Sequence, residues 1–89
     1  MYEKGKQAGT AMFAIKNTMA RDVCVAGQFS NWKPLKMRKA KDGTWTCTVN
    51  ATSSTMEYKF VIDGQWMTDP DNSTSSRNPY GSCNSVARL

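Results

Sequence analysis

Short segments in which apolar and polar residues alternate recur along the chain from residue 10 onward. In the clearest one, residues 56–62, apolar side chains occupy positions 56, 58, 60 and 62 and alternate with Glu57, Lys59 and Val61. Strict alternation is typical of a strand that turns one face to the core. Similar patterns predict further strands over residues 11–16, 22–26, 36–40, 44–50, 65–68 and 83–88.

Turn signals separate these predicted strands, and no pattern indicates a helix longer than one turn. Asp42-Gly43 and Asp63-Gly64 each supply hairpin chemistry, because glycine takes positive φ angles at no steric cost. Residues 69–82 form a polar loop of fourteen residues, and loops of this length are commonly functional. We therefore predict an all-β sandwich in one domain, residues 10–89, preceded by a flexible tail, residues 1–9.

Two of the three tryptophans lie in polar, turn-rich segments. Trp32 and Trp66 are flanked by Gly, Asn, Asp, Gln, Lys and Pro, whereas Trp45 alternates with Cys47 and Val49. The alternation predicts that Trp45 belongs to the core. A tryptophan in a loop offers a flat apolar face, so Trp32 and Trp66 are candidates for stacking on sugar rings or nucleobases. The alternative is that both cover the edge of a sheet.

The residue types exclude most catalytic chemistry. The chain contains no histidine, which removes the commonest general base and metal ligand. There is no glycine-rich phosphate loop, and the acidic residues Asp42, Asp63 and Asp69 are explained by turns. A glycosidase needs two carboxylates on either side of the scissile bond, and no pair stands out. We expect a noncatalytic binding module without metal or cofactor.

The cysteines and the N-terminal segment favour a cytoplasmic protein. Cys24, Cys47 and Cys83 are odd in number and lack metal-ligand spacing, so we interpret them as reduced thiols. The alternative is one disulfide with one free thiol. The first residues lack the apolar segment of a secretory signal. No apolar run approaches the roughly 20 residues that a spanning helix needs, so no membrane partner is expected.

The net charge of +5 comes largely from one basic segment. Residues 33–41 carry five of the twelve Lys and Arg residues: Lys33, Lys36, Arg38, Lys39 and Lys41. Such a run is able to attract phosphates, on nucleic acid or on a phosphorylated polysaccharide. The alternative is a solvated strand whose lysines protect a sheet edge from pairing.

Two segments together resemble family 48 carbohydrate-binding modules. Residues 23–32, VCVAGQFSNW, are similar to the G-x-F-N-x-W stretch of that family. Residues 57–66, EYKFVIDGQW, resemble the Y-K-F-x-V-D-G-x-W stretch of the glycogen-binding domain of AMP-activated protein kinase β subunits. The resemblance extends over residues 11–89. It implies an immunoglobulin-like β-sandwich that binds α-glucans.

The resemblance also assigns site residues. The stacking tryptophans of the family fall on Trp32 and Trp66, and its hydrogen-bonding lysine falls on Lys59. From the backbone pattern alone, Lys59 lies on the strand face opposite Tyr58. It is therefore expected to project between Trp66 and the Trp32 loop, where a solvated surface lysine is the alternative.

The later loop of the family contributes three more ligand contacts. An apolar residue against the glucan, a hydroxyl residue and an asparagine correspond to Tyr80, Ser82 and Asn84, provided that residues 71–79 contain one insertion. Tyr80 replaces the leucine that is usual there, which adds a third stacking surface. These assignments predict that a protruding Tyr80 favours curved α-glucans over flat cellulose.

These observations predict noncatalytic binding of α-1,4-glucans such as glycogen, starch and maltooligosaccharides. The expected role is to target a parent kinase or glucan-active enzyme to polysaccharide. Two alternatives remain: a scaffold domain that makes protein contacts, and a single-stranded nucleic-acid binder that uses the tryptophans with the basic segment. A salt titration separates the last from glucan binding, because nucleic-acid affinity falls steeply with salt.

Overall fold

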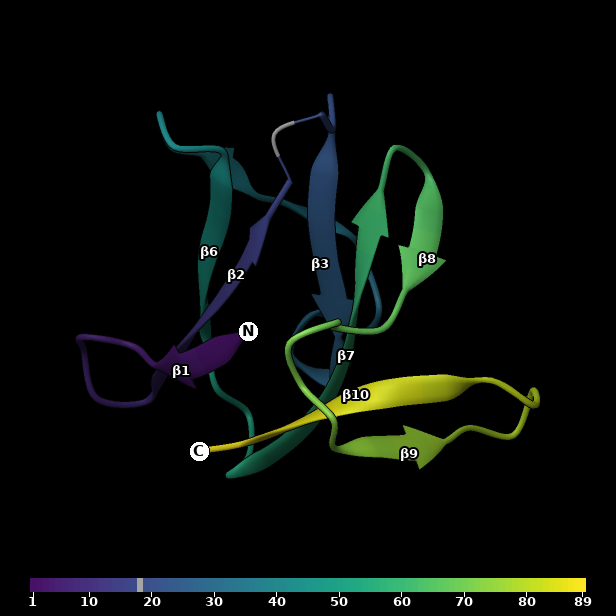
Figure 1. The fold of residues 1–89 in the computed structure, drawn as a ribbon. Coiled ribbons are helices and arrows are strands. Elements are labelled where there is room, and N and C mark those ends of the chain that lie inside the picture. The colour runs from purple at the N-terminus through teal and green to yellow at the C-terminus, as the bar shows by residue number, and fades with distance from the viewer. Residues whose placement is uncertain (18) are drawn as a thin grey trace.

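Two antiparallel sheets pack face to face in the computed structural model, which describes residues 1–17 and 19–89 (Figure 1). The first sheet has the order β1-β2-β6-β5 and the second β4-β3-β7-β10-β9, with β8 also pairing with β7. A 3-10 turn, η1 (Gln28–Ser30), follows β3. This all-β architecture is the immunoglobulin-like sandwich that the sequence predicted. The strands are β1 (Tyr2–Lys4), β2 (Thr10–Lys16), β3 (Val23–Gly27), β4 (Leu35–Lys36), β5 (Arg38–Lys39), β6 (Thr44–Asn50), β7 (Thr55–Ile62), β8 (Gln65–Met67), β9 (Ser75–Arg77) and β10 (Cys83–Arg88).

The alternation in β7 separates the core from the outer face as predicted. Met56, Tyr58 and Phe60 are fully buried between the sheets. Phe13 of β2 packs against Tyr58 with ring centroids 4.6 Å apart, which joins the two sheets. Trp45 is only 8% exposed, and its indole Nε1 donates to the Asn17 carbonyl at 2.9 Å. The prediction that Trp45 belongs to the core is confirmed.

A buried carboxylate closes one end of the core. Asp69 is only 3% exposed. Its Oδ2 accepts a hydrogen bond from the Tyr58 hydroxyl at 2.6 Å and forms an ion pair with the Met1 amino group. Asn72 Nδ2 donates to the same hydroxyl oxygen at 3.1 Å. Burial, reinforced by the hydrogen bond to Asp69, raises the pKa of the Tyr58 phenol well above its usual range. These contacts fix the start of the long loop against the core.

The basic segment differs from the single strand expected over residues 36–40. It forms β4, which pairs with β3, and β5, which pairs with β6, so the chain crosses between the two sheets. Met37 is the crossing point: its side chain is 6% exposed and its amide donates to the Val23 carbonyl at 2.9 Å. The buried methionine interrupts the strand, because its side chain fills the edge of the core.

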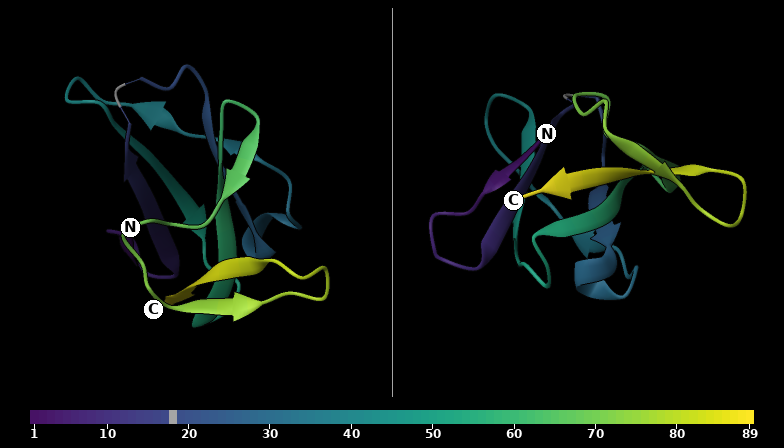
Figure 2. Two further views of the ribbon diagram at one scale, coloured as in Figure 1. Left: turned by 45° about the vertical axis from the view of Figure 1, so that its right-hand side comes forward. Right: turned by 90° about the horizontal axis from the view of Figure 1, so that it is seen from below.

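Two further segments depart from expectation. Within residues 1–9, expected to be a flexible tail, Tyr2–Lys4 pairs with β2, and the Tyr2 ring meets Tyr58 edge-on at 6.2 Å. Within the loop 69–82, Ser75–Arg77 pairs with β10 as β9. Both additions are short strands that gain backbone hydrogen bonds from a longer neighbour. Figure 2 shows the β9–β10 hairpin reaching out on the side of the molecule away from β1.

The cysteines are free thiols, all within the described part of the chain. Cys24 is buried, Cys47 half-buried and Cys83 exposed. Burial raises the pKa of both the Cys24 and the Cys47 thiol, which keeps them protonated. Within residues 1–17 and 19–89, the fold includes no helix of the length and apolar character required to cross a bilayer.

Candidate functional site

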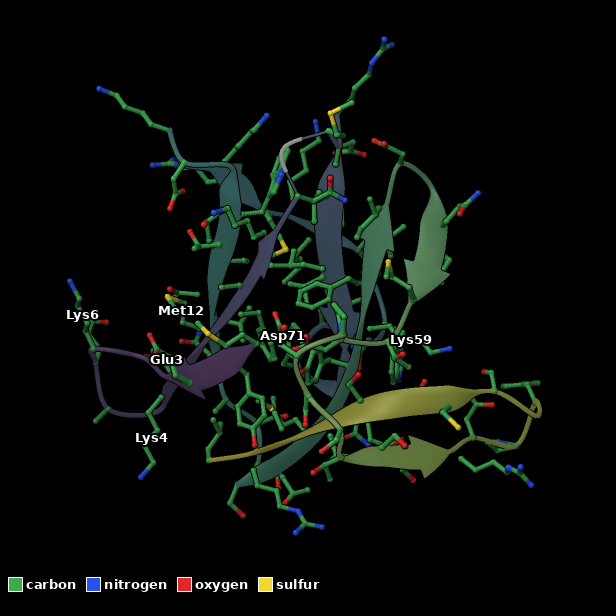
Figure 3. All side chains as sticks on the ribbon, viewed as in Figure 1. Glu3, Lys4, Lys6, Met12, Lys59 and Asp71 are labelled. Carbon is green, nitrogen blue, oxygen red and sulfur yellow. The ribbon has the colours of Figure 1, made fainter. Side chains whose placement is uncertain are left out.

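The outer face of the second sheet brings the predicted site residues together. Directly opposed residues of an antiparallel pair share one face of the sheet. Trp66 of β8 lies opposite Val61 of β7, and Ala26 of β3 lies opposite Lys59 of β7. Val61 and Lys59 are two residues apart, so they lie on the same face of β7. Trp66 and Lys59 therefore share the face that points away from the buried Tyr58. Lys59 lies far from the charged side chains of the β1–β2 hairpin (Figure 3).

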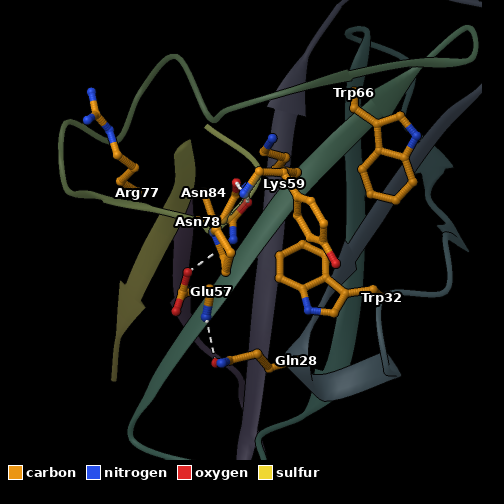
Figure 4. A pocket seen from close by; sticks show the side chains of 10 residues that line it. Gln28, Trp32, Glu57, Lys59, Trp66, Arg77, Asn78 and Asn84 are labelled. Atoms are coloured by element: carbon orange, nitrogen blue, oxygen red, sulfur yellow. Dashed lines mark hydrogen bonds between the residues drawn. The ribbon is translucent and has the colours of Figure 1, made fainter. Parts of the chain in front are cut away.

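A hollow of about 410 Å³ opens on this face. Trp32 and Trp66 stand on one side of it, and Glu57, Asn78 and Asn84 on the other (Figure 4). Of the six predicted site residues, all but Ser82 line the hollow, and Ser82 Oγ accepts a hydrogen bond from Lys59 Nζ at 3.2 Å. The lining residues are Gln28, Trp32, Glu57, Lys59, Trp66, Arg77, Asn78, Pro79, Tyr80 and Asn84.

A strained turn after β3 presents Trp32. Asn31 and Trp32 both have positive φ angles, 52° and 62°, which non-glycine residues seldom adopt. The Trp32 amide donates to the Gly27 carbonyl at 2.9 Å, and Ser30 Oγ donates to the Lys33 carbonyl at 2.8 Å. Strain of this kind persists where the surroundings impose it, and it is concentrated at functional sites.

The glycine that precedes this turn is required by close packing. A Cβ atom on Gly27 would lie 2.5 Å from the Glu57 carbonyl oxygen and 2.4 Å from the Phe29 ring. Phe29 in turn stacks on Phe13 of the core, with centroids 5.1 Å apart. The glycine and phenylalanine of the G-x-F motif therefore anchor the turn, while its tryptophan faces the hollow.

A tight hairpin presents Trp66. Asp63 and Gly64 have φ angles of 49° and 84°, as a type I′ turn requires. The Asp63 carboxylate accepts hydrogen bonds from the amides of Arg21 and Asp22 at 3.0 and 2.9 Å, which ties the turn to the segment before β3. Trp66 stays 49% exposed on this fixed support. Its indole face is available for stacking.

The β9–β10 hairpin presents Tyr80, which is 94% exposed. Asn78 organises this turn: its Oδ1 accepts from the amides of Tyr80 and Ser82 at 3.0 and 3.2 Å. Its Nδ2 donates to Ser82 Oγ at 2.6 Å and to Asn84 Oδ1 at 3.3 Å. Tyr80 itself is held through its backbone, so the ring protrudes from an ordered turn.

A chain of polar side chains runs along the floor of the hollow. Glu57 Oε1 accepts from Asn84 Nδ2 at 3.0 Å, and Asn84 is linked through Asn78 and Ser82 to Lys59 Nζ. Asn84 is only 7% exposed. Its side-chain amide makes two hydrogen bonds within the protein, donating one to Glu57 and accepting one from Asn78. One of its N–H groups and one of its lone pairs stay available to a ligand. The floor therefore offers both donors and acceptors in fixed positions.

The lining residues that sequence reasoning missed are Gln28, Glu57, Arg77, Asn78 and Pro79. Glu57 could have been predicted from the sequence, because it lies two residues before Lys59 on the same face of a strand. Gln28 Oε1 accepts from the Glu57 amide at 3.0 Å, a contact between segments far apart in sequence. Arg77 belongs to a strand that no hydrophobic pattern marks.

The groups that line the hollow are suited to ligand binding. Glu57 is the one carboxylate that lines the hollow among residues 1–17 and 19–89. Glycoside hydrolysis by the usual route needs two. No group of three or more His, Cys, Asp or Glu side chains with metal-binding geometry occurs in the same described ranges. Aromatic faces around fixed donors and acceptors are the chemistry of a sugar site.

A comparison with protein families shows to which family the chain belongs. The family model described as the glycogen recognition site of AMP-activated protein kinase matches residues 12–89. The chain belongs to this family. It is a family of carbohydrate-binding modules, as the two sequence motifs indicated.

Curated relatives include proteins from plants and mammals. Protein PTST homolog 2, chloroplastic, from Arabidopsis thaliana is 36% identical over 57% of this chain and 10% of its own length. Protein FLOURY ENDOSPERM 6, chloroplastic, from Oryza sativa subsp. japonica is 26% identical over 88% and 15%. The 5'-AMP-activated protein kinase subunit beta-1 of Sus scrofa is 30% identical over 56% and 40%. The chain thus spans a minor part of each of these relatives.

A solved structure supports the fold. The crystal structure of a putative alpha amylase from Salmonella typhimurium superposes with a TM-score of 0.73 at 22% identity. The match covers 94% of this chain and 14% of that one. At this identity the likeness shows the sandwich fold alone.

Proposed function

We propose that this chain is a noncatalytic module that binds α-1,4-glucans and holds a parent enzyme or complex on polysaccharide. One observation carries the proposal: Trp32, Trp66 and the protruding Tyr80 border one hollow whose floor carries Lys59 and Asn84. The aromatic rings offer stacking surfaces for the apolar faces of glucose units. The floor offers hydrogen-bonding groups for hydroxyls.

The protruding tyrosine favours a curved ligand. A helically curved α-1,4 chain is able to wrap around an exposed side chain, whereas a flat β-1,4 chain is not. Tyr80 is 94% exposed at the tip of a hairpin that Asn78 holds in place. We therefore expect binding of glycogen, starch and maltooligosaccharides and no binding of cellulose fragments.

The open hollow implies a weak interaction. A shallow site leaves many sugar hydroxyls in water, so we expect affinities between micromolar and millimolar, roughly −8 to −4 kcal/mol. Attachment to a parent kinase or glucan-active enzyme increases the effective affinity when several sites engage one polysaccharide. A parent protein held on glycogen or starch in this way would meet a higher local concentration of its substrate.

The cytoplasmic location stays a prediction, which fluorescence microscopy of the tagged parent protein tests.

The deciding experiment is sedimentation with insoluble glycogen or starch. The wild-type chain should pellet with the polysaccharide, and the Trp32→Ala/Trp66→Ala double variant should stay in solution. Thr48→Ala, at an exposed position of β6 in the other sheet, is the matched control and should pellet like wild type. Retention of the double variant on the polysaccharide, with an unchanged folded spectrum, contradicts the proposal.

A further inference from the structure

Trp66 borders a second hollow on the other side of the β7–β8 hairpin. This hollow measures about 550 Å³, and Ile15 and Lys16 at the end of β2 face the hairpin residues Gln65 and Met67 across it. Trp66 is the one residue that lines both hollows within the described ranges 1–17 and 19–89. A single half-exposed residue of the edge strand β8 thus separates the two hollows.

The strand register explains why this hollow exists. Gln65 lies opposite Ile62 and Met67 lies opposite Phe60, so both belong to the face that would normally be covered by the first sheet. Met67 is nevertheless 39% exposed. β8 lies at the flank of the second sheet, to one side of β2 and β6 (Figure 1). The core-side face of the hairpin is therefore partly open.

The lining of the second hollow combines apolar surfaces with groups of both hydrogen-bonding kinds. Ile62, Met67 and Pro70 supply the apolar surfaces. Lys16 donates, Asp71 accepts, and their charges offset each other, so the hollow has no preference for an anion. A neutral polyhydroxylated ligand fits this combination better than a nucleic acid does.

We propose that a glucan bound in the first hollow continues over Trp66 into the second, which makes the module selective for longer α-1,4 chains. The proposal rests on the function proposed above and assigns one occupant to the second hollow, the continuation of the same chain. Continuity through Trp66 supports this occupant. The two hollows lie on opposite sides of the hairpin, so the ligand must bend around it, as the curvature of α-1,4 chains permits.

Chain-length dependence tests the proposal. Calorimetric titrations compare maltotetraose, the closed ring of β-cyclodextrin, and maltodecaose. Maltotetraose is expected to be too short to occupy both hollows, and the closed ring of β-cyclodextrin has no free end that continues over Trp66, whereas maltodecaose is long enough to continue. Wild type should bind maltodecaose about tenfold more tightly than maltotetraose.

The variants Met67→Ala and Asp71→Ala, alone and together, remove one apolar and one polar contact of the second hollow. The double variant should lose most of the gain with chain length and keep the affinities for maltotetraose and β-cyclodextrin within about twofold of wild type. Met12→Ala, on β2 of the first sheet outside both hollows, is the control and should behave as wild type.

The outcomes separate the two proposals. If the double variant keeps the full gain with chain length, or if wild type shows no gain, the second hollow takes no glucan while the first still does. If wild type binds none of the three ligands, the proposed function itself fails and the extension fails with it. Amide shifts at Lys16, Gln65 and Asp71 that occur with maltodecaose and not with maltotetraose provide an independent supporting readout.

Discussion

Asn78 holds Ser82 through both ends of its side-chain amide. Nδ2 donates to Ser82 Oγ at 2.6 Å, while Oδ1 accepts from the Ser82 amide at 3.2 Å. Ser82 Oγ also accepts from Lys59 Nζ at 3.2 Å, so its own hydrogen is free to point toward a ligand hydroxyl. Asn78 therefore orients the Ser82 hydroxyl while holding the turn that carries Tyr80.

The first prediction concerns this positioning role. Asn78→Ala should weaken maltoheptaose binding by about tenfold, because the turn loses four side-chain hydrogen bonds and Tyr80 loses its fixed position. Asn78→Asp keeps the acceptor for the two turn amides and removes the donor, so it should bind with an intermediate affinity. Isothermal titration calorimetry measures both.

The control for Asn78 is Asn50→Ala, an exposed asparagine on β6 of the other sheet, which should leave the affinity unchanged. A separate denaturation curve distinguishes positioning from folding. If Asn78→Ala binds maltoheptaose as tightly as wild type, the turn is not part of the binding surface.

The second prediction separates the three tryptophans. Trp32→Ala and Trp66→Ala should each weaken maltoheptaose binding by about 1–3 kcal/mol through lost stacking. Trp45→Ala should instead lower the free energy of unfolding by about 3–5 kcal/mol, because it leaves a cavity in the core. Urea denaturation and calorimetry on the same samples measure both quantities. A Trp45→Ala protein with native stability and no glucan binding would reverse these assignments.

Alternation and turn chemistry were enough to predict the strands that carry Lys59 and Trp66. In β7 the period of two predicted that Lys59 and the buried Tyr58 lie on opposite faces of the strand. Asp63-Gly64 predicted the hairpin that presents Trp66. These features depend on residues close in sequence. Local signals are sufficient wherever one face of a strand is apolar and its turn has a distinctive composition.

Features that depend on contacts between distant segments could not be predicted in this way. The division of the basic segment at Met37 depends on which sheet each half pairs with. β9 has the sequence Ser-Ser-Arg, which carries no apolar pattern and pairs only because β10 lies beside it. The role of Asn78 depends on the turn geometry of that hairpin, so no spacing rule singles it out.

The third prediction concerns the buried Tyr58–Asp69 contact. Tyr58→Phe should lower the free energy of unfolding by about 1–3 kcal/mol, because the buried Asp69 carboxylate loses the Tyr58 hydroxyl, one of its donors. Glucan affinity should be unchanged, since Tyr58 lies on the inner face of the sheet. Thermal and urea denaturation near neutral pH measure the loss. A variant as stable as wild type would show that the hydroxyl contributes nothing to the fold.

The raised pKa of Tyr58 adds a pH dependence to this contact. Above about pH 10, tyrosine in the unfolded chain loses its proton while Tyr58 in the folded protein keeps it. The folded state then binds more protons, so its stability falls with rising pH, by up to about 1.4 kcal/mol per unit. Tyr58→Phe should show a shallower alkaline loss than wild type. Parallel slopes for the two proteins would contradict this assignment.

The last prediction distinguishes a glucan from a phosphate-bearing ligand. Glucans are neutral, so the affinity for maltoheptaose should be nearly constant between about 50 and 200 mM salt, a range in which a ligand held by many phosphate contacts weakens by about a thousandfold. The structure favours the neutral ligand, because Lys36 and Arg38 lie in β4 and β5, the strands at the ends of the two sheets. Neither lines the hollow that contains the tryptophans. Lysines at such edges block pairing with other chains.

Lys36→Glu and Lys41→Glu should therefore leave glucan affinity unchanged. A steep salt dependence, or tight binding of a single-stranded oligonucleotide that these substitutions abolish, would instead assign the basic segment to ligand recognition.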